Sequence, residues 1–453
     1  MTISELYSIY LQHPVITTDS RNCPPDSLFF ALNGMTFDGN DFVDSALQAG
    51  CAYAIADRTS LAADRRVIVV DNVLETLQQL ARFHRKNLDI PVIGITGTNG
   101  KTTTKELIAA VLSMKYNVLY TPGNLNNHIG VPLTLLRLTE KHEIAVIEMG
   151  ASHPGEIAVL AAIACPDYGL ITNVGYAHLE GFGSLEGVIK TKGELYDYLR
   201  MTNGTIFIHR DNEYLTSISR GLQKIMYGAA NSAGNNGGQV SDNRDYKNQT
   251  DVISPLSGGL GGAVRNLNPY LSFSWQYSSN EVYELDTRLV GGYNLWNVLA
   301  AIAIGIHFDV PFRKINEAIA GYQPTNNRSQ LQKTKFNELI IDAYNANPSS
   351  MHVALENFAA MPSGTKAVIL GDMRELGVKS LELHAAIIRQ IDAYDFKKVL
   401  LCGEQFSAVG QQYCCFPSVE KLCAYLETHP LRGYHIFIKG SRSMRLEKTV
   451  KLL

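Results

Sequence analysis

Residues 94–104 read Gly94-Ile95-Thr96-Gly97-Thr98-Asn99-Gly100-Lys101-Thr102-Thr103-Thr104. An apolar run at 91–93 precedes this loop, and apolar residues at helical spacing follow it over 105–114. A strand, a glycine-rich turn and the start of a helix together form an anion site, because unpaired backbone N–H groups and the helix dipole point outward there. The lysine adds a positive charge for the β- and γ-phosphates, and the hydroxyl of the threonine after it is placed for Mg²⁺. The sequence therefore predicts that residues 96–103 bind a nucleoside triphosphate.

The glycine spacing of this loop departs from the common pattern. In G-x-x-x-x-G-K-[ST], the first glycine falls at position 95 when the second is Gly100. This chain has Ile95 there, and its glycines are Gly97 and Gly100. The loop is therefore a variant form. A chance glycine-rich turn before a helix is the alternative, and the flanking strand, lysine and threonine argue against it.

The composition limits the class of protein. A length of 453 residues corresponds to about three domains of ordinary size. The net charge of −3 argues against a nucleic-acid partner that needs a broad basic face. The seven cysteines contain no C-x-x-C pair, which favours free thiols in a reducing compartment over disulfides or a zinc site. Neither a leader pattern nor a long apolar span is visible. We expect a monomeric cytoplasmic protein that contacts neither nucleic acid nor membrane.

The pattern of strands and helices divides the chain into three α/β domains. Residues 1–88 form a small unit, and residues 89–312 alternate strands and helices at lengths that predict a doubly wound, mostly parallel sheet around the phosphate loop. Residues 313–453 repeat the alternation, which predicts a C-terminal Rossmann-like domain. A stretch rich in Gly, Asn and Ser at about 229–268 predicts a flexible insertion without a catalytic role.

Polar side chains follow two predicted strands of the central unit. Glu148 ends the strand at 144–148, and His178 lies shortly after the strand at 168–172. Ligands of open α/β sheets bind beyond the carboxyl ends of the strands, so both side chains are candidates to hold Mg²⁺ beside Thr102. The alternatives are an ordinary strand-end acid and an ordinary loop histidine.

Two lysines, Lys190 and Lys192, lie in the helix that is predicted after the strand at 168–172. Both can be solvated surface charges. Alternatively, a lysine whose pKa is depressed presents a free amine that adds CO₂, and the carbamate would act as a carboxylate toward a second Mg²⁺. The sequence leaves the two interpretations open.

Amide side chains mark two further places. Asn126 and Asn127 belong to an asparagine-rich loop, where amides either fix a turn or donate hydrogen bonds to a polar substrate. Asn294 opens a predicted helix and would reach a nucleotide base.

The third unit adds charged groups at its strand ends. Arg328 lies at the domain junction, where its guanidinium suits phosphate charge. Asp342 ends a strand and can accept from ribose hydroxyls, and Asn345 follows in the same segment. Lys439 begins a basic turn after the last strand.

These motifs, in this order, resemble the Mur ligase family of peptidoglycan synthesis over nearly the whole chain. The segments that carry the resemblance are Thr96–Thr103, Gly123–Asn127 with Ile129–Pro132, Glu148–Ser152, Asn173–Glu180, Lys192–Glu194, Asp342–Pro348 and Leu370–Gly377. They are most similar to the member that adds D-alanyl-D-alanine to UDP-N-acetylmuramoyl-tripeptide. The member that adds the third residue typically carries a histidine in the motif at 342–348 and an Asp-Asn-Pro-Arg segment, and this sequence has neither.

The resemblance implies a role for each candidate residue. The implied ATP-binding residues are Thr96, Gly97, Thr98, Asn99, Gly100, Lys101, Thr102, Thr103, Asn294, Arg328 and Asp342. The implied Mg²⁺ site is Thr102, Glu148, His178 and a carbamylated Lys192, with Lys101, Lys192 and His178 as the catalytic residues. The implied substrate contacts are Asp19, Ser20 and Arg21 for the UDP end, with Asn126, Asn127 and Asn345 elsewhere. One departure is Tyr293, where the family often has histidine.

The activity that the resemblance implies is amide-bond formation. The γ-phosphoryl group of ATP would pass to the tripeptide carboxylate, and the amine of D-alanyl-D-alanine would displace phosphate from the acyl phosphate. The alternatives are another ligase of the same architecture, such as the third-residue-adding enzyme or a folate polyglutamate ligase, and a nucleotide-switched binding protein.

Overall fold

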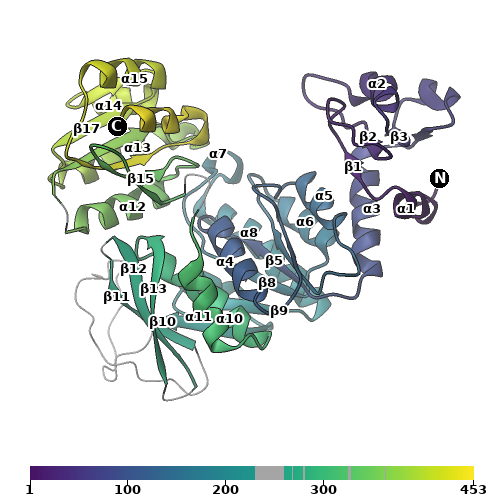
Figure 1. Ribbon diagram of the computed structural model, residues 1–453, viewed down its shortest axis with the longest axis horizontal. Coiled ribbons are helices and arrows are strands. Elements are labelled where there is room, and N and C mark those ends of the chain that lie inside the picture. The colour runs from purple at the N-terminus through teal and green to yellow at the C-terminus, as the bar shows by residue number, and fades with distance from the viewer. Residues whose placement is uncertain (230–259, 268, 279–280, 325–327, 363) are drawn as a thin grey trace.

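Three sheets organise the chain in the computed structural model, which describes residues 1–229, 260–267, 269–278, 281–324, 328–362 and 364–453. The N-terminal and C-terminal units form two lobes that stand on either side of the central unit (Figure 1). Strands alternate with helices over most of the described chain, so the predicted α/β fold with a mostly parallel central sheet is confirmed.

The N-terminal unit is a four-stranded parallel sheet in the order β1-β2-β3-β4 within the described residues. Its strands are β1 Ile16–Thr17, β2 Leu28–Phe30, β3 Tyr53–Ala56 and β4 Val67–Val69, and its helices are α1 Ile3–Gln12, α2 Val43–Gln48 and α3 Val73–Asn87. A capping box between Thr2 and Glu5 starts α1, and the Asn72 side chain caps α3.

The central unit is built on a nine-stranded sheet in the order β13-β12-β11-β10-β9-β8-β5-β7-β6, counted over the described ranges. Its strands are β5 Val92–Thr96, β6 Val118–Tyr120, β7 Ile144–Glu148, β8 Tyr168–Ile171, β9 Thr205–His209, β10 Gln223–Ala229, β11 Leu260–Asn266, β12 Tyr270–Tyr277 and β13 Val282–Val290. Its helices are α4 Lys101–Leu112, α5 Gly130–Leu135, α6 Glu156–Ala164, α7 Leu179–Phe182, α8 Leu185–Thr202, α9 Glu213–Ile218, α10 Asn294–His307 and α11 Phe312–Gly321.

One part of the central sheet differs from the prediction. Residues 230–259 of the predicted insertion lie outside the described residues, but Leu260–Asn266 form strand β11, which pairs parallel with β10. The antiparallel strands β12 and β13 then extend the sheet. Trp275 and Phe273 on β12 are fully buried against α10 and α11, so this edge has a core of its own.

The C-terminal unit is a six-stranded sheet in the order β14-β15-β19-β16-β17-β18 within the described chain, and all its pairs except β14 with β15 are parallel. Its strands are β14 Gln330–Lys333, β15 Glu338–Asp342, β16 Lys366–Gly371, β17 Lys398–Cys402, β18 Cys414–Phe416 and β19 His435–Lys439. Its helices are α12 Pro348–Ala360, α13 Ser380–Asp392, α14 Glu404–Val409 and α15 Val419–Thr428.

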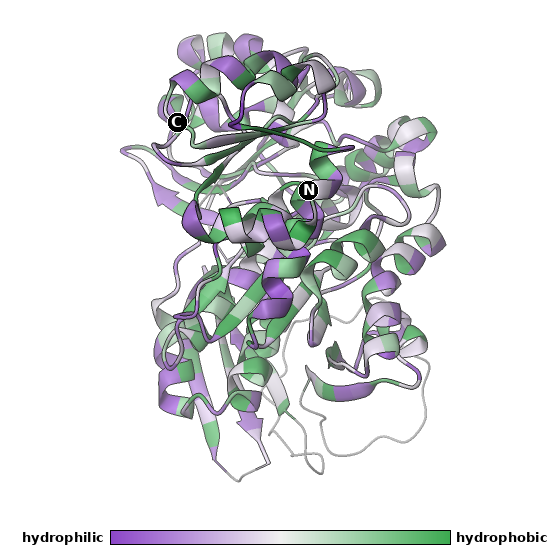
Figure 2. Cartoon of the chain, turned by 90° about the vertical axis from the view of Figure 1, so that its right-hand side faces the viewer, coloured by the Kyte–Doolittle hydropathy of each residue, from purple (hydrophilic) through white to green (hydrophobic). Residues whose placement is uncertain are grey.

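The N-terminal and central units share one continuous apolar cluster. Leu6 and Leu80 from the first unit join Val131 and Leu135 of α5 in it. The hydroxyl of Tyr10 donates to the carbonyl of Leu136 at 2.7 Å. Many helices are hydrophobic along one side and hydrophilic along the other (Figure 2), as expected when one face packs on a sheet.

Helix α11 packs with the central unit. Its residues Ile315 and Ile319 are buried in the central core, and Asn316 accepts a hydrogen bond from the Trp275 indole at 3.0 Å. Just after it, the hydroxyl of Tyr322 donates to Glu106 at 2.6 Å. The sequence division at 312 and 313 assigns this helix to the C-terminal unit, and we propose instead that the unit begins after Tyr322.

In the described part of the chain, no helix combines the length and the apolar character that a membrane span needs.

Candidate active site

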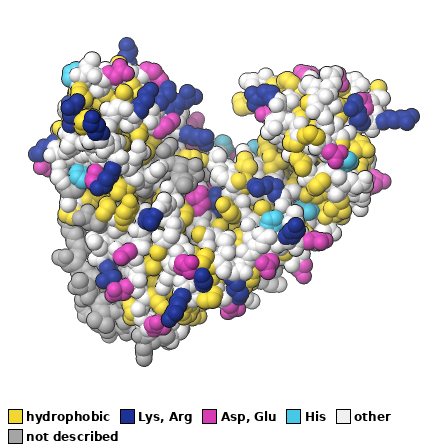
Figure 3. All heavy atoms as spheres, viewed as in Figure 1, with side chains coloured by type: hydrophobic (Ala, Val, Ile, Leu, Met, Phe, Trp, Pro, Cys, Tyr) yellow, Lys and Arg dark blue, Asp and Glu magenta, His cyan; other side chains and the backbone are white. Residues whose placement is uncertain are grey.

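A cavity of about 1260 Å³ lies between the central and C-terminal units. The carboxyl ends of β5, β7 and β8 line it from one side, and the segments after β15 line it from the other, which is where open α/β sheets bind ligands. The molecular surface is deeply hollowed between the two outer lobes (Figure 3). The cavity is large enough for several substrates at once.

The backbone of the phosphate loop explains its displaced glycine. Gly97 has φ +142°, and a Cβ atom there would lie 2.0 Å from the Thr172 hydroxyl oxygen. That hydroxyl donates to the carbonyl of Asn99 at 2.6 Å, and the amide N–H of Asn99 donates to the Asn173 side chain at 2.9 Å. The residues at the end of β8 therefore hold the loop through hydrogen bonds. Glycine is needed at position 97 because these residues approach the loop most closely there. Gly100 has φ +77° at the start of α4.

Lys101 lies across the mouth of this loop. Its ammonium group donates to the carbonyls of Gly97 at 2.7 Å and Thr98 at 3.2 Å. Burial is the largest cause that lowers its pKa, and the charge of Glu148 acts in the opposite direction. Phosphate oxygens would satisfy the same ammonium better than two carbonyls, because an ionised acceptor makes the stronger hydrogen bond.

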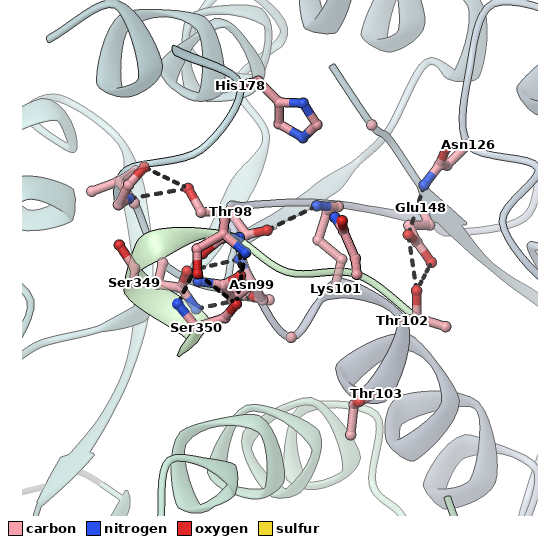
Figure 4. A pocket seen from close by; sticks show the side chains of 18 of the residues that line it. Thr98, Asn99, Lys101, Thr102, Thr103, Asn126, Glu148, His178, Ser349 and Ser350 are labelled. Atoms are coloured by element: carbon pink, nitrogen blue, oxygen red, sulfur yellow. Dashed lines mark hydrogen bonds between the residues drawn. The ribbon is translucent and has the colours of Figure 1, made fainter. Parts of the chain in front are cut away.

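Glu148 is the centre of a buried polar cluster. Its carboxylate accepts hydrogen bonds from the Thr102 hydroxyl at 3.0 and 3.1 Å and from the Asn126 amide at 2.8 Å (Figure 4). Lys105, which is fully buried, forms an ion pair with it at 3.3 Å and donates to the carbonyl of Gly123 at 3.0 Å. In the sequence, Lys105 is one residue of a helical pattern, and the pattern gives no partner for it. Its position one turn after Lys101, on the same helix face, was the available signal.

The oxygen atoms of Thr102 and Glu148 fit a magnesium ion, which prefers hard oxygen ligands. The structure brings these two predicted ligands together. Among the residues it describes, no group of three His, Cys, Asp or Glu side chains converges to hold a metal. The predicted ligands His178 and Lys192 each have another partner, described next.

Lys192 is buried on α8, behind the wall of the cavity. Its side chain is 2% exposed, its amine donates to the carbonyl of Ala151 at 3.3 Å, and the Phe182 ring lies 5.2 Å below it. Burial, helped by the positive charge of Lys101, lowers its pKa to about 7. The amine is therefore neutral in a large fraction of molecules near neutral pH, as the carbamate hypothesis requires.

His178 contacts the C-terminal unit. Its Nδ1 atom is hydrogen-bonded to the Glu375 carboxylate, and this bond is the largest cause that lowers the Glu375 pKa. Both side chains line the cavity, and the His178 ring projects into it (Figure 4). Glu375 belongs to the segment 370–377, whose pattern gave no indication of this partner.

The predicted nucleotide grip from the C-terminal unit has two parts. The Arg328 guanidinium stacks 3.7 Å from the Tyr344 ring centre, and its buried Nε atom has no hydrogen-bond partner among the described residues. Such a group fits an anion. Asp342 is paired with the buried Lys439 at 2.5 Å, so a ribose hydroxyl would have to share this carboxylate with the lysine.

The predicted amide contacts are mostly occupied by local bonds. Asn294 donates to the carbonyl of Val290 at 2.9 Å and accepts from Asn297 at 2.9 Å, although it lines the cavity. Asn127 accepts from the amide N–H of Gly130 at 2.8 Å, which fixes the turn before α5. Asn345 accepts from the next backbone N–H at 2.9 Å. For Asn127 the geometry favours the turn-fixing interpretation, whereas its neighbour Asn126 donates to Glu148.

Two other residues place the C-terminal unit against the phosphate loop. The Asn347 amide donates to the Asn99 side chain at 2.7 Å, and the Ser349 hydroxyl accepts from the N–H of Tyr176 at 3.0 Å. Tyr293, the departure from the family pattern, hydrogen-bonds Ser329 at 2.7 Å across the same boundary. None of these contacts between units is predictable from the sequence pattern.

Asp19, Ser20 and Arg21 lie away from this cavity, in the loop after β1 of the N-terminal unit. Arg21 pairs with Asp19 at 2.9 Å and lowers the Asp19 pKa to about 2. Their predicted contact with the UDP end of a precursor stays a prediction.

Comparison with known proteins gives the same family for every unit. Residues 14–85 match the Mur ligase family catalytic domain, residues 95–305 the Mur ligase middle domain and residues 327–442 the Mur ligase glutamate ligase domain. The chain is 34% identical to UDP-N-acetylmuramoyl-tripeptide–D-alanyl-D-alanine ligase from Bacillus subtilis, over 96% of this chain and 92% of that protein. It is 35% identical to the protein of the same name from Escherichia coli, over 99% of this chain and 95% of that protein.

A solved structure resembles the whole fold. The MurF ligase of Thermotoga maritima in complex with ADP superposes with a TM-score of 0.81 at 26% identity, covering 98% of this chain and 97% of the other. Family matches in all three units, full-length relatives and a full-length structural neighbour lead to one conclusion. The chain belongs to the Mur ligase family.

Proposed function

We propose that this protein joins D-alanyl-D-alanine to the tripeptide carboxylate of UDP-N-acetylmuramoyl-tripeptide, using ATP. The relatives of that name match over nearly the full length of the chain, which supports the substrate assignment. The observation that carries the chemistry is the pair of cationic side chains from two units. Lys101 on the phosphate loop and the unsatisfied Arg328 of the C-terminal unit line one cavity. The relative from Thermotoga maritima was solved in complex with ADP, which supports the use of an adenine nucleotide.

The reaction needs activation of a carboxylate, whose oxide is a poor leaving group. Lys101 and Arg328 would hold the γ-phosphoryl group and offset its charge while it passes to the tripeptide carboxylate. The amine of D-alanyl-D-alanine then attacks the acyl phosphate, and inorganic phosphate leaves. Contact between the units, through Asn347 and Ser349, would keep water from that intermediate.

The magnesium proposal rests on the residues that hold Thr102 and Glu148 in place. When bound, Mg²⁺ would neutralise phosphate charge and orient the oxygens. Asn126 and Lys105 fix the Glu148 carboxylate from two sides. We propose that Lys192 as its carbamate, with His178, completes the set, which requires the carbamate to form at the buried amine.

A coupled assay tests the proposed function. We expect phosphate release from ATP to require UDP-tripeptide and D-alanyl-D-alanine together, with a pentapeptide product visible by mass spectrometry. Tripeptides ending in lysine and in diaminopimelate are run side by side to identify the third residue. ATP hydrolysis that is indifferent to both substrates would refute the ligase and favour a nucleotide-switched protein.

A further inference from the structure

One turn of the C-terminal unit reaches across the cavity to α7. The Glu375 carboxylate bonds the Nδ1 atom of His178, and the carbonyl of Glu375 accepts from the backbone N–H of Glu180 at 3.2 Å. The two side chains line the cavity, and this contact is additional to the bonds that Asn347 and Ser349 make to the central unit. Glu375 thus touches the central unit twice, once through its side chain and once through its backbone.

Both members of the pair have an unusual backbone conformation. His178 has φ +50° and Glu375 has φ +61°, in the left-handed region that non-glycine residues seldom adopt. Such a conformation is strained and persists only where the surrounding structure fixes it. Non-glycine residues held in this way cluster at functional sites, and both residues of this pair line the cavity.

A buried network holds the turn that carries Glu375. Asp372, which is 2% exposed, accepts from the backbone N–H groups of Gln405 at 3.0 Å and Phe406 at 2.9 Å. The backbone N–H of Met373 donates to the fully buried His384 at 3.0 Å. The turn that presents Glu375 to the cavity is therefore bonded to the start of α14 and to α13, although the Glu375 side chain is about half exposed.

The carboxylate of Glu375 determines which tautomer the neutral His178 ring adopts. An ionised carboxylate only accepts hydrogen bonds, so Nδ1 of His178 must be the donor. In the neutral ring the lone pair is then on Nε2, the nitrogen that remains for a ligand. A partly exposed pair adds little to stability, so its contribution is orientation. Carboxylates that hold a ligating histidine in this way are worth about 10- to 100-fold in metal affinity or activity.

We propose that Glu375 is a positioning residue that presents the Nε2 atom of His178 to the phosphate end of the cavity, and that it does so only when the C-terminal unit is docked. This inference rests on the proposed function, since it assigns Glu375 a part in the same reaction. It makes docking of the C-terminal unit a condition for a correctly oriented His178.

The test combines a spectroscopic readout with kinetics. Histidine ring nitrogens are labelled with ¹⁵N, and the His178 signals are assigned by their loss in His178→Asn. In the nucleotide-free and metal-free wild type we expect a single tautomer with the proton on Nδ1, and in Glu375→Ala a mixture. We expect kcat of Glu375→Ala to fall about 10- to 100-fold with KM for ATP little changed. Glu375→Gln, which keeps an acceptor oxygen, should lose less.

Glu180→Gln is the matched control, because it neutralises an exposed neighbouring carboxylate while keeping both His178 and the backbone N–H that bonds Glu375. It should leave tautomer and kcat unchanged. The proposal is overturned if Glu375→Ala keeps the wild-type tautomer, or if its kcat equals that of wild type. A wild type that fails to ligate D-alanyl-D-alanine would defeat the proposed function instead, and the tautomer would still report on Glu375.

Discussion

Replacing Lys192 by methionine should stabilise the fold while abolishing ligation. The buried amine has a pKa of about 7 instead of 10.5, chiefly because burial disfavours its charged form. Between these two values the unfolded chain binds a proton that the folded protein does not, so stability rises with pH across this window. One pKa unit corresponds to about 1.4 kcal/mol. The lowered pKa of Lys192 therefore destabilises the folded state by about 4 kcal/mol at pH 7 and by about 2 kcal/mol at pH 9.

Methionine fills a similar volume without a titrating group, so Lys192→Met removes this destabilisation of the folded state. Urea unfolding of both proteins, free of nucleotide and CO₂, gives the difference in unfolding free energy at pH 7 and pH 9. We expect the variant to be more stable at pH 7, with an advantage that shrinks by about 2 kcal/mol at pH 9. Lys190→Met, an exposed position on the same helix, is the control and should show no such trend. A difference that is the same at both pH values would refute the reasoning.

Three further outcomes are expected from the same site. Lys101→Ala should keep its circular dichroism spectrum and lose about 10²-fold or more in ligation rate, since a preorganised charge is removed; a wild-type rate would contradict the loop assignment. Lys192→Ala should be inactive and regain part of its activity with small carboxylates, and full unaided activity would count against the carbamate. Lys105→Met should cost about 3–5 kcal/mol in urea unfolding, because it leaves Glu148 buried without its cation. The double variant with Glu148→Gln should cost less than the sum of the single changes, and simple additivity would show that the pair is not coupled.

The fold was largely predictable, because the period of the apolar residues and the lengths of the segments indicate parallel β-α-β units without any knowledge of contacts. The turn between β5 and α4 and the place of Glu148 at the end of β7 followed from local sequence. Strand β11 did not, because its Leu-Gly-Gly-Ala start resembles the glycine-rich residues before it. Its place in the sheet comes from pairing with β10 and β12.

The site was predictable only where chemistry is local. The pairing of Glu375 with His178 joins residues 197 positions apart in the chain, and no spacing rule reaches that far. Lys439 was predicted as a basic turn, yet the structure pairs it with Asp342. For Gly97 the reverse holds. The sequence shows where this glycine is, but only the fold shows why glycine is required there, since Thr172 approaches its backbone.

The shared apolar cluster between the first two units determines how the chain can be divided into fragments. A cut after residue 88 would leave Leu6 and Leu80 uncovered on one piece and Val131 and Leu135 uncovered on the other. Exposed apolar patches of this kind favour aggregation. The C-terminal unit instead has clusters of its own, joined from the central unit by Val290 and by Tyr270 at their margin. For expression as separate pieces, the molecule therefore divides best after Tyr322, into an N-terminal fragment of two units and a C-terminal fragment of one.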